Sequence, residues 1–284
     1  MFRFMNNLKT GMLLAGLMAI FVVAGYSIGG QRGMVMALVL GGGMNVVAYY
    51  FSDKIALATM RAREVSREEE PGLVGLVEEL ARRAGLPMPR VCICPQEAPN
   101  AFATGRNPSN AVVAVTEGLL RVVDRNELSG VLAHELGHIK HRDILIQTVA
   151  ATVAGAISAL GYLLWFVPMG SGGGNRRGGN ALVALAMIIL APIAAMLLQL
   201  AISRKREYNA DSFGAEVSGD PRYLASALVK LHQVNSRVPM QVAMDSQKNM
   251  FIVEPFTGRE VAKLFNTHPA LEDRLEALIG RKSL

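Results

Sequence analysis

The sequence has almost no cysteine: Cys92 and Cys94 are the only two among 284 residues. They stand two apart in a run that we expect to form a β-strand, so their side chains point to one face and are not expected to form a disulfide. They also lack the second pair of ligands that a four-cysteine zinc site requires. Both thiols are therefore expected to pack in the core of a protein from a reducing compartment.

The sequence also lacks internal repeats and any basic patch interleaved with aromatic residues. The formal net charge is +6 at pH 7, but aromatic residues make up only 6% of the chain. Many of the lysines and arginines stand at the ends of apolar runs, which accounts for much of the positive charge. The sequence therefore argues against a repeat architecture and against nucleic acid as a partner.

Charge itself is absent from four long apolar runs: residues 11–29, 33–51, 144–171 and 180–203. Hydrophobic residues make up 51% of the chain and the mean hydropathy is +0.30, both of which are high for a soluble protein. A helix of about 19 residues crosses ~30 Å of hydrocarbon. We therefore expect four transmembrane helices, with a Gly-rich polar joint between the last two.

Two alternative interpretations concern these runs. Arg3 and Lys9 precede the first run as they would in a signal peptide, but a second apolar run follows almost at once. The last two runs would also suit a buried helical hairpin of a soluble core. Their length without a charge favours membrane spans.

Lysine and arginine near the ends of the runs predict the orientation, because cytoplasmic segments carry an excess of both. The residues on one side of the membrane would be Arg3, Lys9, Lys54, Arg61, Arg63, Lys140, Arg142, Arg204, Lys205 and Arg206. The other side would have only Arg32, Arg176 and Arg177. Both chain termini and His134 are therefore expected in the cytoplasm.

Outside the apolar runs, the sequence predicts helices and a small β-sheet. Pro71 opens an amphipathic helix that Gly85 ends, and a last helix is expected to begin near Thr267 and to end before Gly280. The charged stretch 54–70 is expected to be a helix or a linker. The short β-rich runs are residues 91–94 and 111–115.

The motif His-Glu-x-x-His occurs at residues 134–138, inside a run with helical character. His134 and His138 are four apart, so a helix turns both imidazoles to one face, where they can bind one metal ion. Glu135 stands about 100° further round the helix. Its carboxylate can there act as a base on a water molecule at the metal without being a ligand itself.

The residues around this motif favour a zinc-binding helix over a chance match on a solvated helix. Asp124 and Glu127 form a capping-box pattern that opens a helix at the right place. Gly137 would cost about 1 kcal/mol in mid-helix relative to alanine. Its presence therefore indicates close packing beside the motif.

A catalytic zinc ion usually has three protein ligands, so one is needed besides the two histidines. The metzincin pattern requires glycine and histidine at positions that here hold His141 and Ile144, which excludes that class. Glu207 and Asp211 share a helix face directly after the fourth apolar run. Glu207 is expected to bind the metal, and Asp211 to accept a hydrogen bond from a ligand histidine. For both, the alternative is a solvated surface charge.

The segment between the two β-rich runs has two interpretations. It comprises Asn100, Ala101, Phe102, Ala103, Thr104 and Gly105. It could be an exposed strand whose free backbone groups pair with an extended peptide. It could equally be a plain edge strand or a loop with Phe102 in the core, and the residues alone leave both open.

These motifs resemble those of the HtpX-like family of bacterial membrane zinc metalloproteases, which is related to the CAAX prenyl proteases. The resemblance runs along nearly the whole chain and rests on residues 134–138, Glu207, Asp211, residues 100–105 and Thr267-His268-Pro269. It implies a gluzincin-like peptidase with one Zn²⁺ per chain that clears damaged or misfolded membrane proteins under stress. It also implies that residues 100–105 pair with the substrate, that His268 donates to the oxyanion and that Arg274 orients or supports the site. From the residues alone, His268 could as readily be a residue that caps or packs a helix start, and Arg274 could as readily be a surface charge.

The sequence thus predicts a mainly α fold with a small β-sheet, four transmembrane helices and a gluzincin-like zinc metallopeptidase domain. We expect a transmembrane hairpin at 1–53, the first cytoplasmic part of the catalytic domain at 54–143, a second hairpin at 144–203 and the second cytoplasmic part at 204–284. The expected function is an endopeptidase of the bacterial inner membrane that cleaves misfolded or damaged membrane proteins on the cytoplasmic side. One alternative is a processing protease for a dedicated peptide or lipidated protein. The other is a zinc-stabilised membrane receptor or chaperone that does not cleave, against which the presence of Glu135 argues.

Overall fold

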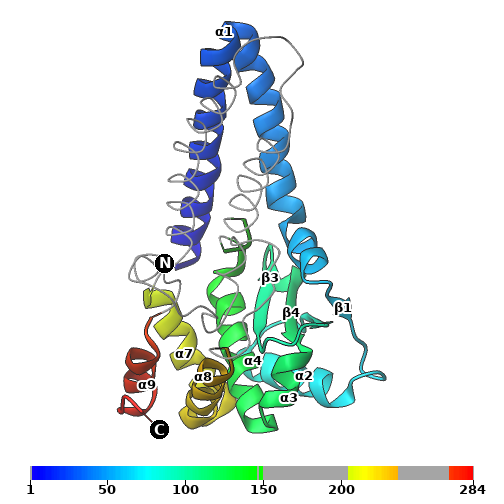
Figure 1. Ribbon diagram of the computed structural model, residues 1–284, viewed down its shortest axis with the longest axis vertical. Helices are drawn as coiled ribbons and strands as arrows, with labels where there is room; N and C mark the ends of the chain where they lie inside the picture. The colour runs from blue at the N-terminus through cyan, green and yellow to red at the C-terminus, as the bar shows by residue number, and fades with distance from the viewer. Residues whose placement is uncertain (1, 146, 150–203, 236–268, 284) are drawn as a thin grey trace, which may run out of the picture.

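The computed structural model describes residues 2–145, 147–149, 204–235 and 269–283. Its first element, α1 (Phe2–Thr59), is a long helical hairpin that projects from a domain formed by the other described elements (Figure 1). The direction of the chain reverses near Gly30, whose φ is +56°. Asn45 ties the second arm of the hairpin to the first, because its Nδ2 donates a hydrogen bond to the carbonyl oxygen of Leu14 at 3.0 Å.

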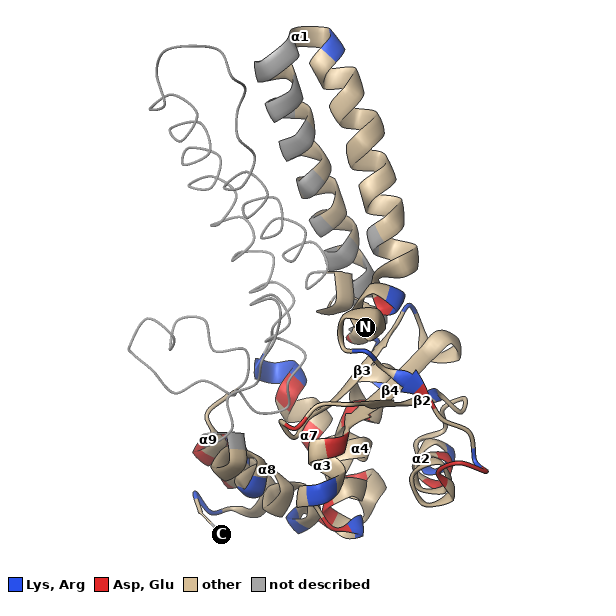
Figure 2. Cartoon of the chain, turned by 45° about the vertical axis from the view of Figure 1, so that its right-hand side comes forward, with Lys and Arg blue, Asp and Glu red and all other residues tan. Residues whose placement is uncertain are grey.

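The second arm of α1 exposes many large apolar side chains. They include Val35, Met36, Leu38, Val39, Leu40, Val46, Val47, Tyr50 and Phe51. Figure 2 shows this arm almost free of charge between its tip and its base. Among the described residues, no single helix has both the length and the apolar character needed to cross a membrane, whereas Gly30–Val47 and Tyr49–Thr59, joined at a bend of 61°, meet the requirement together. The later runs 144–171 and 180–203 lie outside the described residues, apart from 144, 145 and 147–149.

A mixed four-stranded sheet follows α1. Its strands are β1 (Arg63–Glu64), β2 (Arg90–Cys94), β3 (Ala101–Gly105) and β4 (Ala111–Thr116), in the order β1-β2-β4-β3. β2 and β4 are parallel, and the two outer pairs are antiparallel. The two predicted strands are confirmed. The prediction of a helix or linker over 54–70 missed β1, because its two exposed charged residues carry no β-pattern and their strand is defined by backbone pairing with β2.

The remaining described helices are α2 (Pro71–Ala84), α3 (Glu117–Val122), α4 (Arg125–His141), α7 (Arg204–Ser218), α8 (Pro221–Asn235) and α9 (Leu271–Ile279), with a 3-10 turn η1 (Pro108–Asn110). Pro71 opens α2 and Gly85, at φ +61°, caps its end, as predicted. α9 begins at Leu271 rather than near Thr267, because Ala270, with φ −56° and ψ +146°, is not yet helical. It ends before Gly280 as predicted. The mainly helical fold with a small sheet is therefore confirmed.

α4 is the central helix of the domain. It contacts β3 and β4 of the sheet as well as α2, α7 and α8 (Figure 1). Its apolar side chains Val131, Leu132 and Leu136 are completely buried. They share one core with Leu80 of α2 and Leu228 of α8. Packing on several sides therefore fixes α4, which carries the His-Glu-x-x-His motif.

The opposite face of the sheet packs on the base of α1. Cys92, Cys94 and Phe102 form a second apolar cluster with Met60. Both cysteines are buried and free, as predicted. Burial raises the pKa of Cys92 to about 11 and that of Cys94 to about 12. The two thiols are thus protonated at neutral pH and serve as apolar core residues.

Candidate active site

The start of α4 is fixed by a capping box, as the sequence predicted. The Asp124 carboxylate accepts hydrogen bonds from the backbone nitrogens of Asn126 and Glu127 at 2.8 and 2.9 Å, and the Glu127 carboxylate accepts one from the Asp124 nitrogen at 2.9 Å. Glu127 also accepts hydrogen bonds from Ser226 Oγ at 2.5 Å and from Lys230 Nζ at 2.7 Å. One glutamate therefore caps α4 and attaches it to α8.

Two glycines allow α4 and α7 to approach closely. A Cβ at Gly137 would lie 3.1 Å from Ala210 Cα. A Cβ at Gly214 would lie 2.9 Å from the backbone nitrogen of His134. The close packing that Gly137 indicated is confirmed, whereas Gly214 carried no comparable signal in the sequence. This approach brings the carboxylates of α7 beside the histidines of α4.

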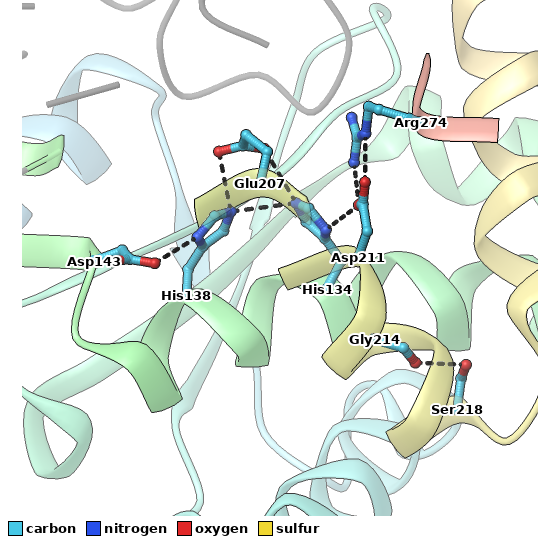
Figure 3. A network of polar contacts seen from close by, with 8 residues as sticks. All are labelled: His134, His138, Asp143, Glu207, Asp211, Gly214, Ser218 and Arg274. Atoms are coloured by element: carbon cyan, nitrogen blue, oxygen red, sulfur yellow. Dashed lines mark hydrogen bonds and ion pairs between the residues drawn. The ribbon is translucent and has the colours of Figure 1, made fainter. Parts of the chain in front are cut away.

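His134, His138 and Glu207 meet at one buried point (Figure 3). Their three potential ligand atoms all lie within 4.8 Å of one another. The two Nε2 atoms are 3.2 Å apart, Glu207 Oε2 lies 3.8 Å from His134 Nε2, and Glu207 Oε1 lies 3.7 Å from His138 Nε2. Two imidazole nitrogens and one carboxylate facing the same point form a donor set that suits a divalent metal ion.

The outward nitrogen of His134 faces a buried ion pair. Asp211 Oδ1 lies 2.8 Å from His134 Nδ1. Arg274 donates to both oxygens of the same carboxylate, from Nε at 2.9 Å and from Nη2 at 2.6 Å. Arg274 and Asp211 are each 1% exposed. Arg274 is therefore no surface charge: it holds Asp211, and Asp211 in turn orients the His134 ring.

The outward nitrogen of His138 also faces a carboxylate, that of Asp143 at 3.3 Å (Figure 3). Asp143 was not among the site residues that the sequence predicted. α4 ends at His141, its capping residue Arg142 adopts φ +60°, and the Asp143 nitrogen then donates to the His138 carbonyl oxygen at 2.9 Å. This turn folds Asp143 back beside the histidine. The only sequence signal was an acidic residue directly after a basic helix end.

Glu135 is buried on α4 beside β3. Burial raises the pKa of its carboxyl to about 7, against the lowering effects of His138 and of a hydrogen bond from the Ala103 backbone. A carboxyl group with a pKa near 7 can both accept and return a proton at neutral pH. The bond from Ala103 also places the backbone of β3 next to the candidate base.

The other titrating groups of the site show how much negative charge it contains. Burial lowers the pKa of His134, despite the opposing effect of Asp211. Burial also favours a lower pKa for His138, but the carboxylates of Glu207 and Asp143 outweigh this effect and raise the pKa of His138 to about 9. Burial alone would raise the pKa of Asp211, but Arg274 and His134 lower it to about 2. A buried site with this many carboxylates favours a cation, which agrees with the geometry of the ligand atoms.

The structure of β3 decides in part between the two interpretations of residues 100–105, an exposed strand that pairs with a peptide and a plain edge strand or loop. All five of its residues are buried, including Phe102 at 2% exposure, so its side chains belong to the core. Among the strands that the structure describes, β3 pairs only with β4 and forms one edge of the sheet. The segment is thus an edge strand with Phe102 in the core. Pairing of its outer edge with a peptide stays a prediction, and His268 lies outside the described residues.

The chain is similar to a known protein family, to curated relatives and to a solved structure. The model of peptidase family M48 matches residues 67–282. A protein described as a protease HtpX homolog from Paraburkholderia phytofirmans is 51% identical over 276 residues, which cover 96% of each chain. One from Pyrococcus furiosus is 52% identical over 271 residues, which cover 95% of this chain and 94% of the relative. The crystal structure of S. mikatae Ste24p is similar in fold, with a TM-score of 0.52 and 18% identity, over 97% of this chain and 65% of the Ste24p chain.

Proposed function

This chain belongs to peptidase family M48 and is a metalloprotease, and on that basis we propose that it is a zinc-dependent endopeptidase of a membrane that cleaves misfolded or damaged membrane proteins on the cytoplasmic side. The observation that carries the proposal is the convergence of His134, His138 and Glu207 on one buried point. Two histidines and one glutamate are the protein ligands of catalytic zinc in thermolysin-type enzymes. A bound zinc ion would supply Lewis-acid polarisation of the peptide carbonyl and an acidic water molecule.

Glu135 would handle the proton in this reaction. It follows His134 directly and lies close enough to the ligand residues that His138 lowers its pKa and Glu207 raises it. With a pKa near 7, its carboxylate takes a proton from the attacking water and then gives it to the leaving amine. The peptide would lie along the outer edge of β3, since the Ala103 backbone is within hydrogen-bonding reach of Glu135.

Location at a membrane is supported by α1 and by the distribution of charge. The second arm of α1 exposes large apolar side chains, as a lipid-facing helix does. The excess of lysine and arginine on one side of the apolar runs supports a cytoplasmic active site and cytoplasmic termini. In this arrangement the catalytic domain comprises 54–143 and 204–284, and the hairpins 1–53 and 144–203 anchor it.

The test compares membranes from cells that contain the wild-type chain or Glu135→Gln. The variant keeps the metal ligands and removes the base, so it should bind zinc normally but fail to cleave. Fragments of many membrane proteins that are detected by proteomics with the wild-type chain should therefore be missing with the variant. Glu117→Gln, at an exposed glutamate of α3, is the matched control and should cleave normally. Unchanged fragments in Glu135→Gln would contradict the proposal. Loss of the fragments of one protein only would indicate the dedicated processing protease instead.

A further inference from the structure

The ion pair behind His134 has a counterpart behind the other histidine. As Asp211 stands between His134 and Arg274, so Asp143 stands between His138 and Arg206. Asp143 Oδ2 lies 3.3 Å from His138 Nδ1, and Asp143 Oδ1 lies 3.9 Å from Arg206 Nε. The order of histidine, aspartate and arginine is the same on both sides of the ligand cluster.

Burial shows that this second series is part of the protein interior. Asp143 is 0% exposed and Arg206 is 6% exposed. Taking a carboxylate and a guanidinium out of water is costly unless each charge meets a partner. Neither group is a ligand atom of the cluster of His134, His138 and Glu207. Asp143 contacts His138 with one oxygen and Arg206 with the other, so the buried pair is connected to one of the ligand histidines.

We propose that Asp143, which forms an ion pair with Arg206, is a positioning residue of the metal site. It accepts the Nδ1 proton of His138, which fixes the ring and leaves Nε2 free to bind the ion. This inference rests on the proposed function, because it assumes that His138 is a metal ligand. It adds a second oriented histidine to the one that Asp211 and Arg274 support.

Asp143 and Arg206 lie at the two ends of the predicted second hairpin. Asp143 directly precedes the run 144–171, and Arg206 follows the run 180–203 by three residues. The two ends of the predicted second hairpin would thus meet at the ring of His138. Arg206 lies on α7, as Asp211 does, whereas Arg274 lies on α9, so the pair of Asp211 and Arg274 involves no residue that precedes the hairpin. The orientation of His138 therefore depends on how both ends of the hairpin are held.

The test measures zinc binding by the full-length chain in detergent, by titration of the metal-free protein with Zn²⁺ against a chelator. Asp143→Ser should weaken binding on the order of 10- to 100-fold, since a serine hydroxyl is too short to reach Nδ1. Asp143→Asn should be milder, at less than about 10-fold, because it keeps an acceptor of the same length but loses the charge. Arg206→Met should weaken binding in the same direction.

Two controls separate positioning from folding. Asp143 also begins a helical turn, because its carbonyl oxygen accepts a hydrogen bond from the Gln147 nitrogen at 3.2 Å. Serine and asparagine both suit the start of a helix, so a capping role alone would leave both variants like the wild type. Asp220→Asn changes another aspartate at a helix start that pairs with an arginine, Arg222, and should not alter zinc binding.

A spectroscopic measurement complements the titration. With Co²⁺ in place of Zn²⁺, the visible absorption bands should shift in Asp143→Ser and stay unchanged in Asp220→Asn, because only the first changes the orientation of a ligand ring. Asp143→Ser with wild-type zinc affinity and an unshifted cobalt spectrum would overturn the inference while leaving the proposed function intact. Equal loss in Asp220→Asn would also overturn it. Tight zinc binding by Glu207→Ala would instead contradict the proposed metal site itself.

Discussion

Gly214 of α7 lies directly against the backbone of His134 in α4: a Cβ at Gly214 would be 2.9 Å from the His134 nitrogen and 3.1 Å from its Cα. Glu207 and Asp211 stand on the same helix as this glycine. The approach of the two backbones therefore sets the separation between the carboxylates of α7 and the imidazoles of α4. Any side chain at position 214 would increase that separation.

We expect Gly214→Ala to destabilise the protein by about 1–3 kcal/mol, because an added methyl group would overpack the contact. It should also weaken metal binding, since α7 would carry Glu207 away from the histidines. Thermal unfolding with and without added Zn²⁺ measures both effects. The matched control is Gly75→Ala in α2, where a Cβ would meet no atom within 4 Å and helix propensity predicts a gain of up to ~1 kcal/mol. Equal stability of the two variants would contradict the packing argument.

Glu207 and Asp211 should differ in what their removal does to the metal. Glu207→Ala removes one of the three ligand groups, so it should lose tightly bound zinc and activity together. Asp211→Asn should weaken zinc binding on the order of 10- to 100-fold, because the carboxylate contacts the outward nitrogen of His134 and is not itself one of the three ligand groups. Bound zinc per protein after dialysis and cleavage of an unfolded protein substrate are the measurements. Full zinc content and normal activity in Glu207→Ala would exclude it as a ligand.

Arg274 should be important for stability as well as for the site. Arg274→Met would leave the buried Asp211 carboxylate without the two hydrogen bonds that it accepts from the guanidinium. Removing one partner of a buried ion pair typically costs about 3–5 kcal/mol. Arg222→Met is the control, because its pair with Asp220 is at the surface and its loss should have little effect on thermal unfolding. Equal unfolding temperatures for the two variants would show that the buried pair does not stabilise the fold.

The contact between α4 and α8 should make stability depend on pH. Burial alone would raise the pKa of Glu127, but hydrogen bonds from Lys230 and Ser226 lower it below its usual value. The ionised carboxylate therefore stabilises the fold above the unfolded pKa of about 4.3, and this contribution is lost as pH falls through the lower folded value. Glu127→Gln should unfold at a lower temperature than the wild type at pH 7, and the difference should narrow below about pH 4. A constant difference across that pH range would contradict the assignment.

The orientation in the membrane can be tested by labelling introduced cysteines. Because lysine and arginine are concentrated on one side of the apolar runs, a cysteine near Arg176 should react with a membrane-impermeant thiol reagent added outside the inner membrane. A cysteine near Lys205 should react only after the membrane is permeabilised. Cys92 and Cys94 should add little background, because both are buried and their pKa values are raised. The reverse labelling pattern would invert the topology.

The features that the sequence determined are local ones. The four-residue spacing of His134 and His138 places both rings on one helix face whatever surrounds that helix. The capping box at Asp124 and the bounds of α2 depend on residues within one turn of the chain, and both were correct. The strands at 91–94 and 111–115 were found for the same reason, because their apolar runs carry the pattern of buried strands.

The tertiary structure decided what depends on residues distant in sequence. Two charged residues in β1 form a strand only because β2 lies beside them. Gly214 became informative only once α7 was packed on His134. Asp143 follows His138 by five residues, but Arg206 is separated from both by the whole run of residues that predicts the second hairpin, so no local pattern could join Arg206 to them. Local geometry follows from backbone and side-chain preferences, whereas the surroundings of the ligands follow from the packing of helices across the chain, which a single sequence does not encode in any short segment.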